Sequence, residues 1–117
     1  MSKISVLAAM LCFAVQAQAQ TTNVKAIEQQ AMAGDYQAQR NLAYGYVAWP
    51  YTGQTKNPIT GCAWYLVVLN SGSPQLGPGD VGNVQVYCGR LDPDSKSAAI
   101  NQSRVLFKQI YRREPKY

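Results

Sequence analysis

Residues 61 to 72 read GCAWYLVVLNSG, an apolar run that contains one cysteine and ends in polar and flexible residues. The β-branched pair Val67-Val68 would suit a strand. The flanks favour a helix instead, because Asn57-Pro58 is a cap followed by a first-turn proline and Ser71-Gly72 is a stop signal. We therefore expect a core helix that begins after Asn57 and extends to about residue 70.

Two shorter helices are expected before this run. From Asn23 to Ala33 apolar residues recur at helical spacing, with Asn23 as a cap and Gly34 as the end. Asp35 is placed to cap a second helix, because the apolar residues that follow it recur at intervals of four and share one face. These residues are Ala38, Leu42 and Tyr46.

The remaining segments alternate loops with helices. Prolines and glycines mark a loop from Trp49 to Asn57 and a linker from Ser73 to Gly79. A short helix is expected from about Val81 to Arg90, and Asp92-Pro93 starts a last helix that ends near Arg112. The chain is therefore predicted to be all-α. The inward face of the last helix is predicted to carry Ala99, Ser103, Leu106 and Ile110.

The N-terminus has the pattern of a secretory signal peptide. Lys3 precedes an apolar run from Ile4 to Val15, which is followed by Ala17-Gln18-Ala19. This run is shorter than the roughly 20 residues that a membrane-spanning helix needs. We expect residues 1–19 to be removed by cleavage after Ala19, which leaves one domain over residues 20–117 in the periplasm or outside the cell.

The chain has three cysteines, of which Cys12 lies in the predicted signal peptide. A lipoprotein anchor at Cys12 is an alternative, but Leu11 stands where a small residue is expected. Cleavage leaves Cys62 and Cys88 as an even pair in an exported chain, where disulfides persist. We expect them to be bonded, which stabilises a loop of this span by about 3–4 kcal/mol. Two separate buried thiols are the alternative.

The formal net charge is +5, and it becomes +4 without Lys3 because the leader contains no acid. A mildly basic exported protein favours anionic partners. Nucleic acid is not an expected partner, because export removes the chain from most of it and no nucleic-acid-binding module is recognised. An acidic protein or an anionic membrane surface could meet the outward basic stripe near the C-terminus, although most such stripes are simply solvated. The stripe comprises Arg104, Lys108, Arg112, Arg113 and Lys116.

The second and third predicted helices carry a repeat-like pattern. It reads Gly34-x3-Ala38-x3-Leu42-Ala43-x2-Tyr46, a loop, then Asn57-x3-Gly61-x2-Trp64-Tyr65-x2-Val68-Leu69-x2-Gly72. This pattern resembles one Sel-like repeat, a helical hairpin related to tetratricopeptide repeats. Ala43 and Gly61 stand where the family usually has Gly and Ala, and Trp49-Pro50-Tyr51 replaces its loop glycines. The segment from Leu91 resembles the closing helix of small bacterial members.

The resemblance implies antiparallel helical hairpins stacked as a short α-solenoid, because each hairpin buries its apolar face only against its neighbours. In that arrangement Cys62 reaches Cys88 and links the regular hairpin to the degenerate one. The expected core contacts join Trp64, Val68 and Leu69 to Leu42 and Tyr46.

In tetratricopeptide-like hairpins the first helix lines a concave groove, and the loop with Trp49 and Tyr51 would lie at its end. Large aromatic residues on loops are frequent interface anchors. For the groove positions of the first helix, the alternative to a binding role is ordinary solvent exposure. For the loop, the alternative is that the Trp49 ring folds over the hairpin end. The resemblance predicts a protein-binding adaptor. The small size and expected export of the chain, and not the resemblance, suggest an inhibitor or immunity protein against a toxin or cell-envelope enzyme, with partner and oligomeric state open. The implied groove positions are Gln37, Arg40, Tyr44 and Val47.

The sequence offers little for catalysis. It contains no histidine, which removes the commonest general base and metal ligand. Asp92 and Asp94 are the only close acid pair and flank Pro93, where capping explains them. No cofactor or metal motif is recognised, and GPGDVG at 77–82 reads as linker plus cap. We predict no enzyme activity. The alternatives are a peptidoglycan-acting envelope enzyme that uses these aspartates and a structural subunit of an envelope assembly.

Overall fold

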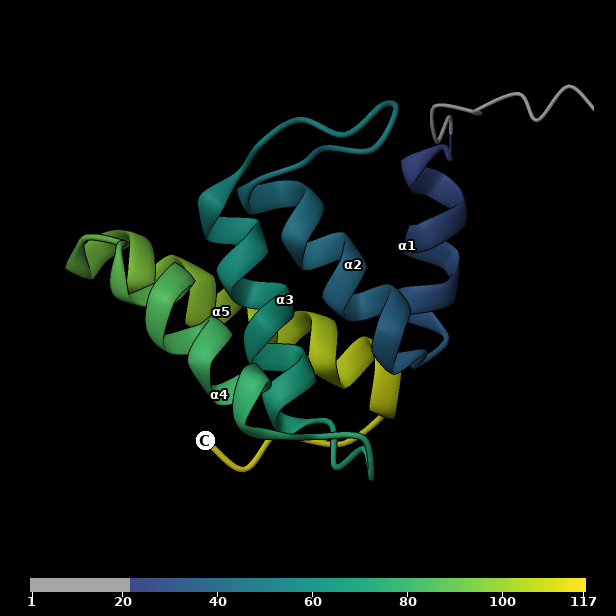
Figure 1. Ribbon diagram of the computed structural model, residues 1–117. Coiled ribbons are helices and arrows are strands. Elements are labelled where there is room, and N and C mark those ends of the chain that lie inside the picture. The colour runs from purple at the N-terminus through teal and green to yellow at the C-terminus, as the bar shows by residue number, and fades with distance from the viewer. Residues whose placement is uncertain (1–21) are drawn as a thin grey trace, which may run out of the picture.

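The computed structural model describes residues 22–117, and over that range the chain is helical with no strand (Figure 1). The predicted signal peptide, its cleavage site and Cys12 lie outside the described residues. Among the helices described, none is long and apolar enough to cross a membrane. The elements are α1 (Val24–Met32), α2 (Tyr36–Val47), α3 (Pro58–Asn70), α4 (Pro78–Asn83), the π-helical η1 (Val84–Cys88) and α5 (Pro93–Tyr111).

Four helices begin at the predicted caps. Each cap side chain accepts a hydrogen bond from a backbone N–H of the first turn, which would otherwise lack a partner. Gly34 has φ 91°, a left-handed conformation that glycine adopts at little cost, and it separates α1 from α2. The caps are Asn23 for α1, Asp35 for α2, Asn57 for α3 and Asp92 for α5.

The helix predicted from about Val81 begins earlier than expected, so the linker prediction was wrong at Pro78 and Gly79. Gly77 is the cap, Pro78 takes the first helical position, and the Asp80 side chain accepts from Gly77 N–H at 3.0 Å. This is the same cap-then-proline start as Asn57-Pro58, with a carboxylate from inside the helix replacing the cap side chain. At Val84 the α-helix α4 changes into the wider π-helix η1.

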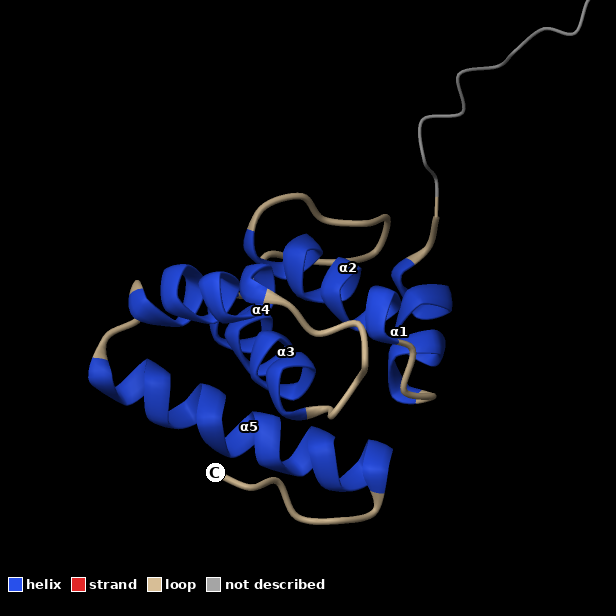
Figure 2. Ribbon diagram, turned by 60° about the horizontal axis from the view of Figure 1, so that its bottom comes forward, coloured by secondary structure: helices blue, strands red, loops and turns tan. Residues whose placement is uncertain are grey.

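Helix α3 occupies the centre of the molecule. It packs against α2, α5 and η1, while α1 lies on the far side of α2 and touches α5 (Figures 1 and 2). A helix that is covered on several sides needs apolar residues around its whole circumference. The buried residues of α3 are Gly61, Cys62, Ala63, Trp64, Tyr65, Val67 and Val68.

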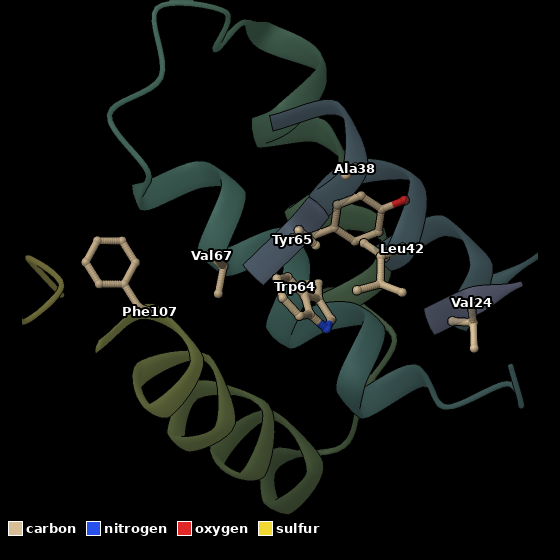
Figure 3. Packing of buried hydrophobic residues seen from close by; sticks show 9 residues of the cluster. Val24, Ala38, Leu42, Trp64, Tyr65, Val67 and Phe107 are labelled. Carbon is tan, nitrogen blue, oxygen red and sulfur yellow. The ribbon is translucent and has the colours of Figure 1, made fainter. Parts of the chain in front are cut away.

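The main core cluster joins α3 to α2 and α1. Leu42, Trp64 and Tyr65 meet at its centre, with Val24 at one end and Phe107 at the other (Figure 3). Tyr46 packs against the same cluster, as predicted, whereas Leu69 is only half-buried.

Phe107 is the largest fully buried side chain, and the sequence analysis did not place it inside. It is fully buried, whereas the predicted inward residues Leu106 and Ile110 are half-buried. Ala99, Ser103 and Phe107 follow one another at intervals of four and form the buried row of α5. The guanidinium carbon of Arg113 lies 4.7 Å from the centre of the Phe107 ring and helps to cover it.

Cys62 and Cys88 form a disulfide between α3 and η1, as predicted, with their Cα atoms 5.0 Å apart. A second buried cluster surrounds it, in which Ala99 of α5 is completely enclosed. The bond therefore fixes η1 to the central helix at the point where α5 also packs.

Helices α2 and α3 approach each other closely at Gly61. A Cβ atom at this position would collide with the Val47 side chain and would lie 3.2 Å from the backbone oxygen of Ala43 and from Tyr46 Cβ. The absence of a side chain at Gly61 therefore sets the distance between the two helices.

The disulfide is expected to carry a large share of the stability. The variant Cys62→Ser/Cys88→Ser should lose about 3–4 kcal/mol of unfolding free energy, because the unfolded chain regains the entropy of the open loop. Urea unfolding with and without reductant measures this loss, and reductant should not affect the variant. Equal stability of the oxidised protein and the variant would contradict this role.

Replacement of Gly61 should test the close approach. Gly61→Ala is expected to cost about 1 kcal/mol or more, because overpacking outweighs the helix propensity that alanine adds. Gly82→Ala is the matched control, since a Cβ there meets no atom within 4 Å, and it should stabilise by about 0.5–1 kcal/mol. Urea unfolding compares the two, and a stabilising Gly61→Ala would refute the packing described.

Candidate binding site

Two adjacent hollows of about 240 Å³ each lie along the outer face of α2. They share Asn41 and Tyr44, so the two form one continuous surface. We call them the aromatic hollow and the polar hollow. The aromatic hollow is lined by Asn41, Tyr44, Trp49, Pro50 and Tyr51. The polar hollow is lined by Gln37, Arg40, Asn41, Tyr44, Tyr65, Asn83 and Tyr87.

Gln54 holds the loop that forms the aromatic hollow. Its amide nitrogen donates to the backbone oxygen of Leu42 at 3.0 Å, and its amide oxygen accepts from Tyr51 N–H at 3.0 Å. The Gln54 side chain fits against α2 only because Gly45 has no side chain, since a Cβ there would collide with the amide. Tyr51 and its neighbours are therefore tied to the helix.

Further backbone bonds secure both ends of the loop. Trp49 N–H donates to the Tyr44 oxygen at 3.2 Å, and Asn57 N–H donates to the Tyr46 oxygen at 2.9 Å. In the middle, the Thr52 oxygen accepts from Val24 N–H at 2.9 Å, which ties the loop to the start of α1. The loop has a defined shape although it contains no helix or strand of its own.

The aromatic side chains of this hollow differ in exposure. Trp49 is 76% exposed, and its ring therefore does not plug the hairpin end. Tyr44 is 46% exposed, whereas Tyr51 is half-buried and packs against the main core cluster. Trp49 and Tyr44 thus offer aromatic surface to a ligand, and Tyr51 also has a structural role.

The polar hollow is bounded by a stacked pair of tyrosines. The Tyr65 and Tyr87 rings lie 5.3 Å apart between centroids with an angle of 10° between their planes. Tyr65 belongs to α3 and is only 3% exposed, so burial raises the pKa of its hydroxyl. Tyr87 belongs to η1, which the disulfide at Cys88 attaches to α3. The disulfide therefore also helps to position this wall.

A buried carboxylate links α2 to α4 beside the polar hollow. Asp80 is 2% exposed, and its Oδ1 lies 3.0 Å from Arg40 Nε at an angle that does not make a hydrogen bond. Its Oδ2 accepts from the Tyr36 hydroxyl at 2.6 Å. Burial and this bond raise the pKa of Tyr36. The Arg40 charge is therefore largely balanced by the buried Asp80 carboxylate.

The structure brings together most of the predicted site residues. Gln37, Arg40 and Tyr44 line the polar hollow, and Tyr44, Trp49 and Tyr51 line the aromatic one. Val47 lines neither hollow, because it is half-buried and packs where α3 passes closest at Gly61.

The sequence analysis missed several lining residues. Asn41 lies four positions after Gln37, so helical periodicity could have found it. Asn83, Tyr65 and Tyr87 come from three other elements, and no local pattern places them beside α2.

Intramolecular contacts engage the basic stripe of α5. Arg104 donates to the backbone oxygen of Tyr117 at 3.1 Å, and its guanidinium lies over the Tyr117 ring. Lys108 pairs with Glu114 at 3.1 Å, although both are exposed and the pair adds little stability. Much of this positive charge lies against the chain's own C-terminal residues.

The acid pair near α5 sits at a helix start. The Asp92 carboxylate accepts from Ser95 N–H at 3.3 Å, and hydrogen bonds from Ser95 lower the pKa of Asp92. Asp92 is therefore ionised at neutral pH, as its role as the α5 cap requires. Across residues 22–117, no group of three or more His, Cys, Asp or Glu side chains is placed to hold a metal ion.

Comparison with protein-family models, with curated proteins and with solved structures finds no match to this chain. Function is therefore inferred from the geometry and chemistry of the site itself.

The buried tyrosine at the polar hollow predicts a loss of stability in alkali. Because the pKa of Tyr65 is raised in the folded state above its usual value near 10, folding favours the neutral hydroxyl. The contribution of Tyr65 to stability should be constant below about pH 10 and should be lost as the pH rises further. Tyr65→Phe keeps the ring and should make this fall shallower in urea unfolding between about pH 8 and 11.

The matched control is Tyr44→Phe, which changes an exposed tyrosine and leaves Tyr65 in place. It should retain the steeper alkaline fall of the unmodified protein. The same fall in Tyr65→Phe as in the unmodified protein would show that burial of this hydroxyl is not its cause.

Proposed function

We propose that this protein is an exported protein-binding module, an adaptor or an inhibitor, that binds its partner through the two hollows on α2. The observation that carries the proposal is the exposed ring of Trp49 on a loop fixed by Gln54. Tryptophan and tyrosine dominate the residues that anchor interfaces. A fixed loop limits the entropy that is lost when they bind.

The helical packing supports a Sel-like hairpin as the basis of this module. Helices α1, α2 and α3 pack in chain order, each against the next. Two of the departures from the family pattern, Ala43 and Gly61, meet at the same helix crossing, where a Cβ at position 61 would lie 3.2 Å from the Ala43 oxygen. An exchange of Gly and Ala between these positions preserves the close approach that the family's own pair allows. We therefore propose that the fold is a short solenoid of the Sel-like type.

Export to the periplasm or out of the cell is part of the proposal. The predicted signal peptide motivates it, and the Cys62–Cys88 disulfide is compatible with an oxidising compartment. A bound module of this kind acts by holding its partner or by covering the partner's own site.

Site-specific photo-crosslinking tests the proposed surface in living cells. A photoreactive phenylalanine analogue in place of Trp49 should yield one predominant protein adduct. The same analogue in place of Val105 is the control, because Val105 is 59% exposed on α5 and lines neither hollow. Equal adducts from both positions would contradict the proposed surface.

The captured partner then permits an affinity measurement. Trp49→Ala should weaken binding at least tenfold, about 1.4 kcal/mol, because it removes the exposed anchor. Val105→Ala should leave the affinity unchanged, and circular dichroism should show that both variants are folded. Unchanged affinity of Trp49→Ala would overturn the role assigned to this loop.

A further inference from the structure

We propose that the aromatic hollow binds an uncharged, proline-rich peptide segment in the extended polyproline II conformation. This inference rests on the proposed protein-binding function and names the chemistry of the segment that is bound. It is carried by three properties of the hollow: its aromatic lining, its lack of charge, and the hydrogen-bonding groups that remain available.

The lining suits proline rings. Tyr44 and Trp49 present aromatic surface, and Pro50 and Tyr51 also line the hollow. Polyproline II segments have three residues per turn and dock their rings on grooves of this kind. The bound conformation exists before binding, so both the peptide and the loop lose little freedom.

The hollow carries no charged side chain among its lining residues. The neighbouring cation, Arg40, lies 3.0 Å from the buried carboxylate of Asp80. An acidic, phosphorylated or basic peptide would therefore find no opposite charge among the lining residues of the aromatic hollow. The electrostatics favour a segment without charged side chains.

Two of the hydrogen-bonding groups at the hollow can only donate to a ligand, whereas the Tyr44 and Tyr51 hydroxyls can donate or accept. The Asn41 oxygen already accepts from the Gln37 amide at 2.9 Å, which leaves the Asn41 NH₂ group for a ligand. The Trp49 indole can only donate, and the Gln54 amide is used to hold the loop. Proline-rich backbone offers carbonyl acceptors and lacks the N–H groups that would need acceptors in return.

A glycan would match this arrangement less well. Sugar hydroxyls donate as well as accept, and a site for them needs acceptors beside its aromatic rings. The aromatic hollow has no carboxylate among its lining residues, and the amide oxygens of Asn41 and of the neighbouring Gln54 already accept bonds within the protein. The Tyr44 and Tyr51 hydroxyls are then the remaining side-chain acceptors. The structure therefore favours peptide over sugar, and the test includes both.

NMR titration with an uncharged polyproline peptide of about ten residues tests the inference. The indole N–H of the exposed Trp49 should shift and saturate, whereas that of the buried Trp64 should not. A glycine-serine peptide of the same length is the matched control and should cause no shift. Trp49→Ala should weaken peptide binding at least tenfold.

A substitution at Asn41 tests whether its NH₂ group donates to the bound peptide. Asn41→Asp has nearly the same shape but cannot donate when ionised, so it should weaken polyproline binding at least tenfold. Asn101→Asp adds the same charge on the exposed face of α5 and should leave the affinity unchanged. Equal affinities for these two variants would overturn the assignment of Asn41.

The outcomes separate this inference from the proposed function. If polyproline causes no shift at Trp49, or if an N-acetylglucosamine oligomer shifts it and polyproline does not, the inference is wrong. The proposed function still stands in that case if Trp49 forms its specific protein adduct. Saturable polyproline binding that both Trp49→Ala and Asn41→Asp weaken at least tenfold would support the inference.

Discussion

The burial of α3 is the constraint on which the rest of the structure depends. Its apolar residues surround the helix, so α2, α5 and η1 must all pack against it. Gly61 permits the close approach of α2, and the disulfide at Cys62 fixes η1 on another side. A domain of this size has little stability to spare, which gives one covalent link and one close helix crossing a large influence.

The same packing exposes the candidate site. Because α2 buries Leu42 against α3, its opposite face is left to solvent with Asn41 and Tyr44. Gln54 then ties the following loop to α2, so Trp49 is held in the open instead of packing on the core. The fold and the site are therefore linked by two small features, the missing side chain of Gly45 and the amide of Gln54.

Local signals predicted the helices well and the contacts between distant segments poorly. Side-chain caps such as Asn57 and Asp92 act within one turn, and both were read correctly from the sequence. The start at Pro78 was missed because Asp80 reaches back from inside the helix. Phe107 continues the four-residue spacing of Ala99 and Ser103, so the helical period was available for it but was followed to Leu106 and Ile110 instead. Tyr65 and Tyr87 owe their places to packing between elements, which periodicity within one helix does not specify.

The candidate site depends on a rigid loop after α2 that presents Trp49 to solvent. Backbone ¹⁵N relaxation of residues 49–54 tests it most directly, together with contacts between the Gln54 amide protons and Gly45 in nuclear Overhauser spectra. The account predicts order parameters near those of rigid backbone, about 0.85, and strong Gln54–Gly45 contacts. Order parameters below about 0.6 without these contacts would contradict it.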